Sequence, residues 1–192
     1  ELDFQQRSGV MMMFRNQKEL DQALPLMESL GEFGARNELL DAEAARQLEP
    51  ALSADTPFHS ALFMPDDWAG NCPLFVRQLK TRAQDMGVEF HFNSEVQAIR
   101  PELGGVSFTI DGNHIDADAV VIAAGADSPR LLRGLGISLP MYPVKVYSAS
   151  TAIQEYELAP QVSLYDDTYR VSLTRLGKRI RIAGCAELGS SS

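Results

Sequence analysis

Three small residues, Ala123, Ala124 and Gly125, follow directly on the apolar run at residues 119–122. A continuous apolar run is typical of a strand buried on both faces, as in a parallel sheet. In dinucleotide-binding sheets, the end of such a strand has to be small because the backbone packs closely against the cofactor. We therefore interpret these three residues as a wall of a cofactor site, although a buried strand that ends in a plain turn explains them equally well.

The glycine-rich turn that should accompany such a wall is missing. Dinucleotide-binding domains hold the pyrophosphate at a strand–GxGxxG–helix unit, and no GxGxxG occurs in the 192 residues. Gly134 and Gly136 do not replace it, because they follow an expected helix and lack the third glycine. The sequence therefore predicts only the second half of a nucleotide-binding domain. The start without Met at Glu1 and the serine-rich end at residues 190–192 are likewise typical of a cut chain.

The composition excludes several other kinds of site. The formal net charge of -9 disfavours a nucleic-acid partner, since phosphate backbones are bound by clustered Lys and Arg. The cysteines, Cys72 and Cys185, are too few and too far apart for a CxxC motif, and the three histidines show no HxxxH spacing. We expect no metal site. No apolar run approaches the ~20 residues of a membrane-spanning helix.

The apolar pattern predicts alternating strands and helices up to residue 140, and strands from there on. Helices are expected at residues 17–30, 42–49, 74–86 and 128–133, with Asn16 and Asp41 as N-caps. A meander of three strands at residues 96–100, 105–110 and 113–116 includes the hairpin turn Asp111–Gly112. Other strands are expected at residues 9–14, 38–40, 61–65, 88–92, 119–123, 142–150, 162–164, 169–174 and 180–185.

Several stretches, taken in order, resemble the bacterial D-amino-acid dehydrogenase small-subunit family, which lies within the D-amino-acid-oxidase-like flavoproteins. They are GVMMMFR at 9–15, LEPAL at 48–52, MPDDWAGNCPLF at 64–75, GVEFHFNSEV at 87–96, ADAVVIAAGADSPRLL at 117–132, YPVKVYS at 142–148 and residues 164–187. Each motif alone is loose, whereas their order and spacing together are specific. The resemblance covers essentially the whole chain and identifies it as a central fragment of such a protein.

The resemblance implies an FAD enzyme that removes hydride from the α-carbon of a D-amino acid, giving an imino acid that hydrolyses to a 2-oxo acid and ammonia. It implies electron transfer to a respiratory-chain acceptor, and a cytoplasmic location that is peripheral at the inner face of the inner membrane. The arginine that clamps the substrate carboxylate in relatives lies in a stretch beyond residue 192. No arginine of this chain is therefore assigned that role, and the catalytic residues stay unknown.

The resemblance also assigns site residues. Tyr165 and Tyr169 match two tyrosines beside the substrate in related oxidases, and in a regular strand they would share a face. An ordinary aromatic strand position explains Tyr165 equally well. Val96 matches a position whose backbone bonds the adenine, and it joins the wall residues 123–125 as a cofactor contact.

Two departures from the family pattern place the substrate range in doubt. Val146 stands where the family has Gly after the Lys of a KGYS-like motif, and residues 69–72 replace an acidic TGDC-like loop. A related amine-oxidising flavoprotein, similar to glycine or sarcosine oxidase, is therefore an alternative. A non-catalytic interaction domain that kept the scaffold is another.

The expected fold is α/β with α+β character. Residues 1–63 and 141–192 would form part of a mixed-sheet substrate domain, and residues 64–140 the second half of a Rossmann-like FAD-binding domain. We expect this stretch alone to be inactive and to bind no FAD tightly. An uncovered sheet edge would favour its self-association.

Overall fold

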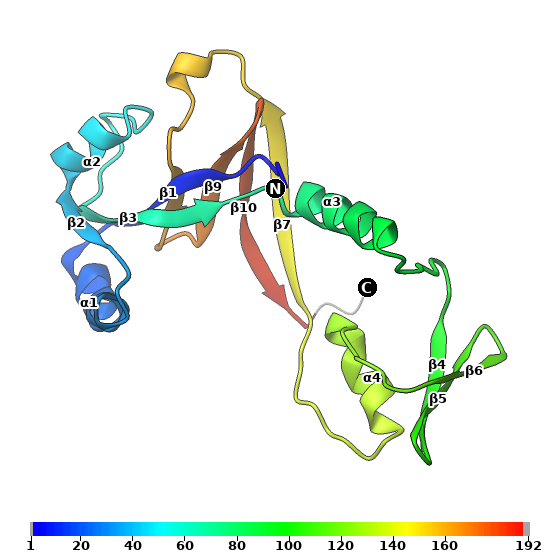
Figure 1. The fold of residues 1–192 in the computed structure, drawn as a ribbon. Helices are drawn as coiled ribbons and strands as arrows, with labels where there is room; N and C mark the ends of the chain where they lie inside the picture. The colour runs from blue at the N-terminus through cyan, green and yellow to red at the C-terminus, as the bar shows by residue number, and fades with distance from the viewer. Residues whose placement is uncertain (1, 190–192) are drawn as a thin grey trace. The chain divides into compact units, whose positions relative to one another are not determined.

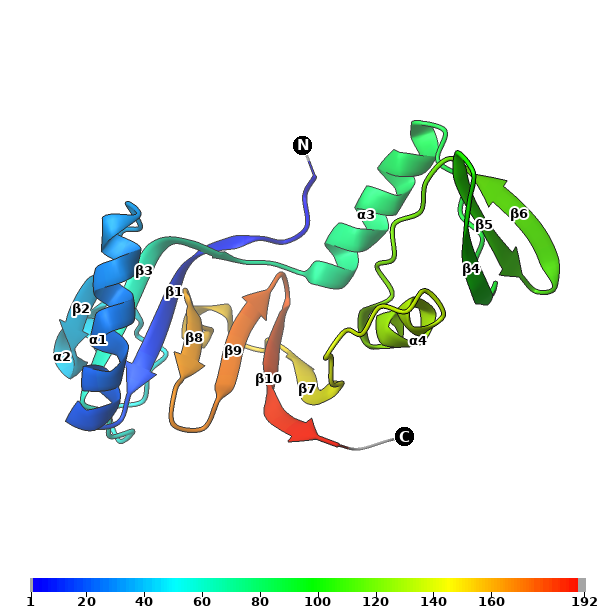
Figure 2. The same ribbon diagram turned by 90° about the horizontal axis from the view of Figure 1, so that it is seen from below.

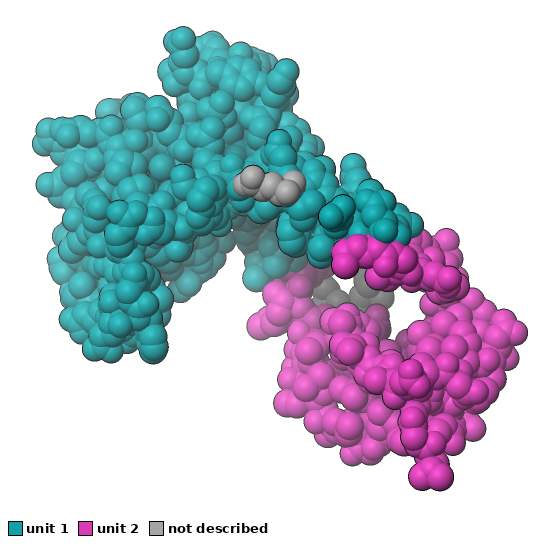
Figure 3. All heavy atoms as spheres, viewed as in Figure 1, with its two compact units in different colours: residues 1–85, 146–186 teal, residues 86–145, 187–192 magenta. Residues whose placement is uncertain are grey.

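The computed structural model describes residues 2–189, and the expectation about the chain ends falls partly on residues 1 and 190–192, outside this range. Two compact units are present, residues 1–85 with 146–186 and residues 86–145 with 187–192 (Figure 3). The expected division at residues 63 and 64 falls inside strand β3 (Ser60–Ala69), whereas the compact units divide after Asp85. The assignment of residues 1–63, 64–140 and 141–192 to domains stays a prediction.

The first unit is built on a mixed seven-stranded sheet in the order β2-β3-β1-β8-β9-β10-β7 (Figure 1). Strand β1 (Arg7–Phe14) pairs antiparallel with β3 and parallel with β8 (Ser163–Asp166). Strand β9 (Val171–Leu176) joins β8 to β10 (Arg179–Leu188), and β2 (Glu38–Asp41) and β7 (Val144–Ala152) are the edges. The expected mixed α/β class is thereby confirmed.

Alternation along β1 distributes its methionines to two cores. Met11 and Met13 are buried in a cluster with Ala45 of α2 (Ala42–Leu48). Met12 and Phe14 point to the opposite face, where they pack with Leu20 and Met27 of α1 (Gln17–Glu32). Figure 2 shows α1 lying beside β1. Both expected caps are confirmed, since the side chain of Asn16 accepts from Glu19 N and that of Asp41 from Ala44 N.

The second unit contains the expected meander β4 (Val96–Glu102), β5 (Gly105–Ile110) and β6 (Asn113–Ala117). Asp111 and Gly112 both have positive φ, 48° and 83°, as a two-residue hairpin turn of type I′ requires. Helix α4 (Ser128–Arg133) follows a 3-10 turn η1 (Gly125–Asp127), and α3 (Cys72–Asp85) and the 3-10 turn η2 (Tyr156–Leu158) belong to the first unit.

Two expected strands are wrong. Residues 119–123 have no regular structure and Val121 is 89% exposed, so the predicted buried parallel strand is absent. A parallel strand needs hydrogen-bonded neighbours, and within residues 2–189 the only sheet of the second unit is the β4-β5-β6 meander. Residues 88–92 also form no strand, and Phe92 is 62% exposed. In both segments local pattern predicted pairing for which the described residues provide no partner.

Candidate functional site

A cavity of about 700 Å³ lies in the first unit, between α1 and the face of strands β1, β8 and β9. Its apolar side is formed by Met12, Phe14 and Met64, which belong to the face of the sheet that α1 partly covers. Tyr165, which is paired with Met12 in the neighbouring strand, and Arg170 supply polar groups. An apolar floor with a few converging polar groups is the usual composition of a small-molecule site.

A buried hydroxyl adds to the polar side of this cavity. Ser163 lines it and is 5% exposed, and its Oγ has no hydrogen-bond partner among the described residues. Buried polar groups are normally hydrogen-bonded, so an unpaired hydroxyl at a cavity wall favours a polar ligand there.

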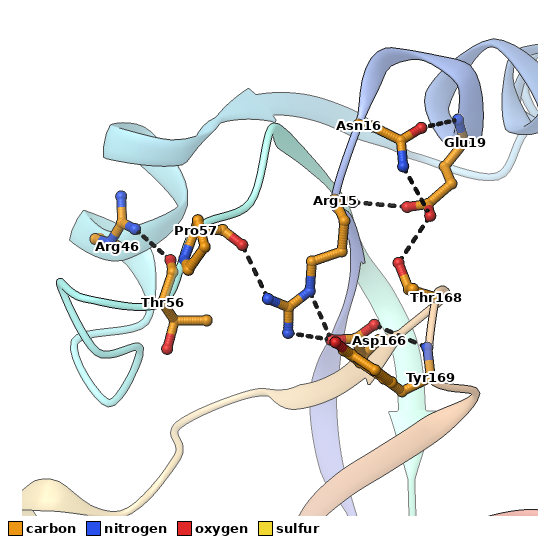
Figure 4. A network of polar contacts seen from close by, with 9 residues as sticks. All are labelled: Arg15, Asn16, Glu19, Arg46, Thr56, Pro57, Asp166, Thr168 and Tyr169. Carbon is orange, nitrogen blue, oxygen red and sulfur yellow. Dashed lines mark hydrogen bonds and ion pairs between the residues drawn. The ribbon is translucent and has the colours of Figure 1, made fainter.

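The turn between β8 and β9 carries Tyr169 and Arg170. Arg15 binds Asp166 at the beginning of this turn (Figure 4). The Nε and Nη2 of Arg15 donate to Oδ2 of Asp166 at 3.1 and 2.7 Å, and its Nη1 donates to the carbonyl of Pro57 at 2.9 Å. Asp166 also accepts from the backbone N–H of Tyr169 at 3.2 Å. The half-buried Arg15–Asp166 pair therefore links the end of β1 to this turn.

Glu19 at the start of α1 also binds this turn, through a hydrogen bond with Thr168 (Figure 4). Its Oε1 accepts from the hydroxyl of Thr168 at 2.8 Å, and its Oε2 accepts from the backbone N–H of Arg15 at 2.7 Å. These hydrogen bonds, that of Thr168 first, lower the pKa of the Glu19 carboxyl below its ordinary value. The carboxylate form therefore stabilises the turn at neutral pH.

Arg170 is the cation of the cavity. Its Nη1 lies 3.5 Å from the hydroxyl of Tyr165 and 3.1 Å from Oδ1 of Asp167. The contact with Tyr165, and then the charge of Asp167, raise the pKa of the guanidinium further above its ordinary value. A guanidinium has five N–H donors, so Arg170 keeps donors for a ligand.

The structure separates the two candidate substrate tyrosines. Tyr165 lies in β8 and lines the cavity. Tyr169 lies in the turn after β8, is 66% exposed, and does not line the cavity. The premise that both share a face of one strand is thus wrong, because β8 ends at Asp166. The guanidinium carbon of Arg15 lies 5.2 Å from the centre of the Tyr169 ring, a cation–π contact that orients this ring.

The candidate cofactor residues belong to the second unit. Val96 is half-buried at the start of β4, paired with Ile110. Ala123, Ala124 and Gly125 are exposed, and Gly125 begins the 3-10 turn η1 with φ of +55°. A Cβ added at Gly125 would meet no atom within 4 Å, so its left-handed backbone, rather than crowding, favours glycine there.

The structure also places the two sites at which the sequence departs from the family pattern, Val146 and residues 69–72. Val146 is 58% exposed on strand β7. Asn71 is buried and caps α3, since its Oδ1 accepts from Leu74 N at 3.3 Å, while Cys72 is an exposed free thiol.

Two other properties bear on the kind of site. Within residues 2–189 no group of three His, Cys, Asp or Glu side chains is placed to hold a metal ion. In the same range no helix is long and apolar enough to cross a membrane.

Sequence reasoning missed Arg15, Glu19, Asp166 and Arg170. The contact from Arg15 to Asp166 spans 151 residues, and no local pattern indicates such a pair. The sequence signal that could have indicated these residues was the alternating pattern of β8 and its short connection to β9, which places Asp166 and Arg170 at a tight turn.

The comparisons with known proteins agree with this fold. A family model described as FAD dependent oxidoreductase, DAO, matches residues 1–192, and the chain belongs to this family. Among curated proteins it is 41% identical over 192 residues to a D-amino acid dehydrogenase of Vibrio cholerae serotype O1 (strain M66-2), covering 97% of this chain and 45% of that protein. A D-amino acid dehydrogenase of Bradyrhizobium diazoefficiens is 38% identical over 194 residues, covering 100% of the chain and 46% of the relative.

These matches confirm the resemblance that the sequence motifs indicated, and the chain spans somewhat less than half the length of these curated relatives. Among solved structures, a glycine oxidase from Geobacillus kaustophilus superposes with a TM-score of 0.89 at 23% identity, covering 100% of this chain and 51% of that one. An L-proline dehydrogenase from P. horikoshii gives 0.81 at 18% identity, covering 97% and 50%. At such identities the two structures show the shared fold alone.

Proposed function

We propose that the protein containing this chain is an FAD-dependent dehydrogenase that oxidatively deaminates D-amino acids to 2-oxo acids and ammonia. The observation that carries the proposal is the 41% identity, along 97% of the chain, to a D-amino acid dehydrogenase. The FAD would accept the hydride that leaves the α-carbon, and water would then hydrolyse the imino acid. A D-amino acid is the proposed substrate partner, and a respiratory-chain component the proposed electron acceptor.

The cavity beside Tyr165 is the proposed place for the substrate. The clamping arginine that the resemblance implies would lie beyond residue 192. In addition to it, the Arg170 guanidinium and the Tyr165 hydroxyl also suit a carboxylate, because charged hydrogen bonds to carboxylates are strong and directional. The apolar wall of Met12, Phe14 and Met64 suits an apolar side chain. The carboxylates of Asp167 and Glu19 line the same cavity and suit the amino group. Tyr169 lies in the turn after β8 and does not line this cavity, so its role as a second phenol for the substrate carboxylate is a proposal that rests on the family resemblance.

The residues of this chain fit only part of an FAD molecule. The backbone at Val96 is the proposed adenine contact, and Ala123, Ala124 and Gly125 are the proposed wall. The backbone at residues 119–124 is irregular and mostly exposed, so it does not form the buried parallel strand that such a wall needs. No GxGxxG turn occurs in the sequence to hold the pyrophosphate. No step of the reaction is therefore derived through the cofactor.

We infer from this partial fit that the 192-residue chain by itself binds no FAD tightly and has no dehydrogenase activity. A few backbone contacts are too little to offset the cost of ordering a large flexible ligand. Exposed apolar residues of the second unit, such as Val121 and Tyr142, favour self-association. The test is to mix the purified chain with excess FAD, desalt it and record the visible spectrum. A retained stoichiometric flavin band would contradict the inference.

The function itself is tested in the protein at its natural length. The purified protein is assayed with a panel of D-amino acids, their L enantiomers, glycine and sarcosine, using an artificial electron-acceptor dye and measuring the 2-oxo acid formed. We expect dye reduction and 2-oxo acid with D-amino acids and not with the L enantiomers. Activity restricted to glycine or sarcosine would support the related amine oxidase instead. A protein without flavin or activity would support the non-catalytic interaction domain.

The proposed location is cytoplasmic, peripheral at the inner face of the inner membrane, because transfer of electrons to a respiratory-chain acceptor requires access to that surface. Fractionation of cells that express the protein tests this. Recovery of the protein with membranes at low salt, and its release at high salt, is the expected result.

A further inference from the structure

A second cavity, of about 560 Å³, lies in the first unit between the start of α3 and strands β7, β9 and β10. It is distinct from the cavity beside Tyr165, with which it shares no lining residue. Most of its lining residues are polar, and none is acidic: Gln5, Asn71, Arg77, Ser148, Arg179 and Arg181 are the polar ones that bear on a ligand.

Three arginines face this cavity in a chain whose formal net charge is -9. Arg77 comes from α3, and Arg179 and Arg181 come from β10. Within residues 2–189, none of the three takes part in an ion pair. Guanidinium groups that line one cavity repel one another, and where no acidic residue lines the cavity their charge favours a bound anion.

The strand register explains why two of these arginines act together. Arg179 pairs with Leu176 and Arg181 with Thr174, so both side chains leave the same face of β10. The Nη2 of Arg181 donates to the hydroxyl of Ser148 on β7 at 3.1 Å, which fixes the direction of its guanidinium. The remaining N–H groups of Arg181 keep their capacity to bind a ligand.

The first turn of α3 adds to the positive potential. Pro73 and Leu74 line the cavity, and Asn71 caps the helix while its Nδ2 donates to Gln5 at 2.8 Å. The N-terminal end of a helix of this length, 14 residues, carries a partial positive charge. The helix end and the arginines thus act on the same space from different elements.

We propose that this cavity binds the phosphate group of a small organic phosphate. Three guanidinium groups and a helix N-terminus match a dianion with several acceptor oxygens better than a single carboxylate. The cavity volume leaves room for an organic part beside the phosphate. The proposal stands independently of the dehydrogenase function, since it uses none of the residues assigned to substrate or FAD.

The experiment measures binding of inorganic phosphate to the protein at its natural length, by thermal unfolding and by isothermal titration calorimetry. Sodium chloride at equal ionic strength is the control for screening, and sodium acetate is the control for a carboxylate. The test variants are Arg179→Gln, Arg181→Gln and Arg77→Gln. The matched control is Arg82→Gln, in the last turn of the same helix and outside the cavity.

We expect a saturable rise of Tm with phosphate and none with chloride. Affinity should fall at least tenfold in each of the Arg77, Arg179 and Arg181 variants and stay unchanged in Arg82→Gln. Arg179 is exposed, so Arg179→Gln should leave the fold intact, and its result is decisive if Arg181→Gln unfolds. Equal shifts with chloride, unchanged affinity in Arg179→Gln, or acetate binding as tight as phosphate would each overturn the proposal.

Discussion

Glu49 is the most buried charged residue among residues 2–189, with no exposed surface, and its side chain links the end of α2 to the segment just before β8. Its Oε2 accepts from the backbone N–H of Gln161 at 2.5 Å and of Val162 at 2.8 Å, and its Oε1 accepts from Ala51 N at 3.0 Å. Glu49→Ala removes the acceptor for all three N–H groups. Hydrogen bonds to a charged group contribute ~1.5–3 kcal/mol each, and an N–H left buried costs ~1–3 kcal/mol.

The three bonds are not equal, and the expected loss follows from their burial. The N–H of Val162 lies in a buried residue and stays unsatisfied after the substitution, while Gln161 and Ala51 are more exposed and regain water. We therefore expect Glu49→Ala to lower the free energy of unfolding by about 3–5 kcal/mol. With an m-value of ~2 kcal/mol/M in urea, the midpoint should fall by about 1.5–2.5 M.

Urea unfolding followed by tryptophan fluorescence is the assay, because the only Trp, Trp68, lies in β3 of the same unit. Glu49→Gln should cost less, about 1–2 kcal/mol, since its amide oxygen still accepts from Gln161 and Val162. The control Glu43→Ala, at an exposed site of the same helix, should change the stability by less than ~0.5 kcal/mol. A loss in Glu49→Ala no larger than in the control would refute the reasoning.

Three further predictions concern the site and its surroundings. Tyr169→Phe in the natural-length protein should raise KM for a D-amino acid by roughly 10- to 100-fold, because it removes a hydrogen bond of ~1.5–3 kcal/mol to the carboxylate. Unchanged steady-state kinetics would show that Tyr169 has only a structural role, through its contact with Arg15. Gly125→Val should lower the flavin content per protein, read from the visible spectrum, since a branched residue is strained at φ of +55°; full flavin content would count against a cofactor contact there. Glu19 has a lowered pKa in the folded state, so its stabilisation of the turn is present above its ordinary pKa of 4.5 and is lost as pH falls through the folded value. Thr168→Val should return that pKa toward 4.5, as measured by NMR titration of the carboxyl, and an unaltered titration would exclude the Thr168 hydroxyl as the main cause.

Local sequence signals predicted the caps and turns, whose structure depends on residues only a few positions apart in the sequence. The Asn16 cap acts on an N–H three residues later, and the Asp111–Gly112 turn needs only two residues with positive φ. The apolar run of β1 also predicted a strand, although its ladder partners β3 and β8 lie far along the chain. The cap and the turn depend on contacts within their own segments, whereas for β1 the pattern predicted the strand but not its partners.

The site depends on contacts that no local pattern records. Arg15 meets Asp166 across 151 residues, and Glu49 meets Val162 across 113. Such pairs become visible only when the sheet order places β1 beside β8. The sequence motif at 48–52 was part of the family resemblance. The structural role of its glutamate is evident only from the structure, in which the Glu49 carboxylate accepts hydrogen bonds from three backbone N–H groups.

The irregular backbone of residues 119–123 has a physical cause that also bears on the cofactor. A strand buried on both faces is stable only when neighbouring strands take its N–H and C=O groups and other layers cover its side chains. Within residues 2–189 these neighbours are absent, so Val120 and Val121 are exposed and the chain at Ala123 has no fixed position in a sheet. A small-residue wall binds a cofactor only if its backbone is held at a defined distance from it. The strand and the proposed wall therefore require the same neighbouring strands, so we expect FAD binding and formation of this strand to appear together in the protein at its natural length.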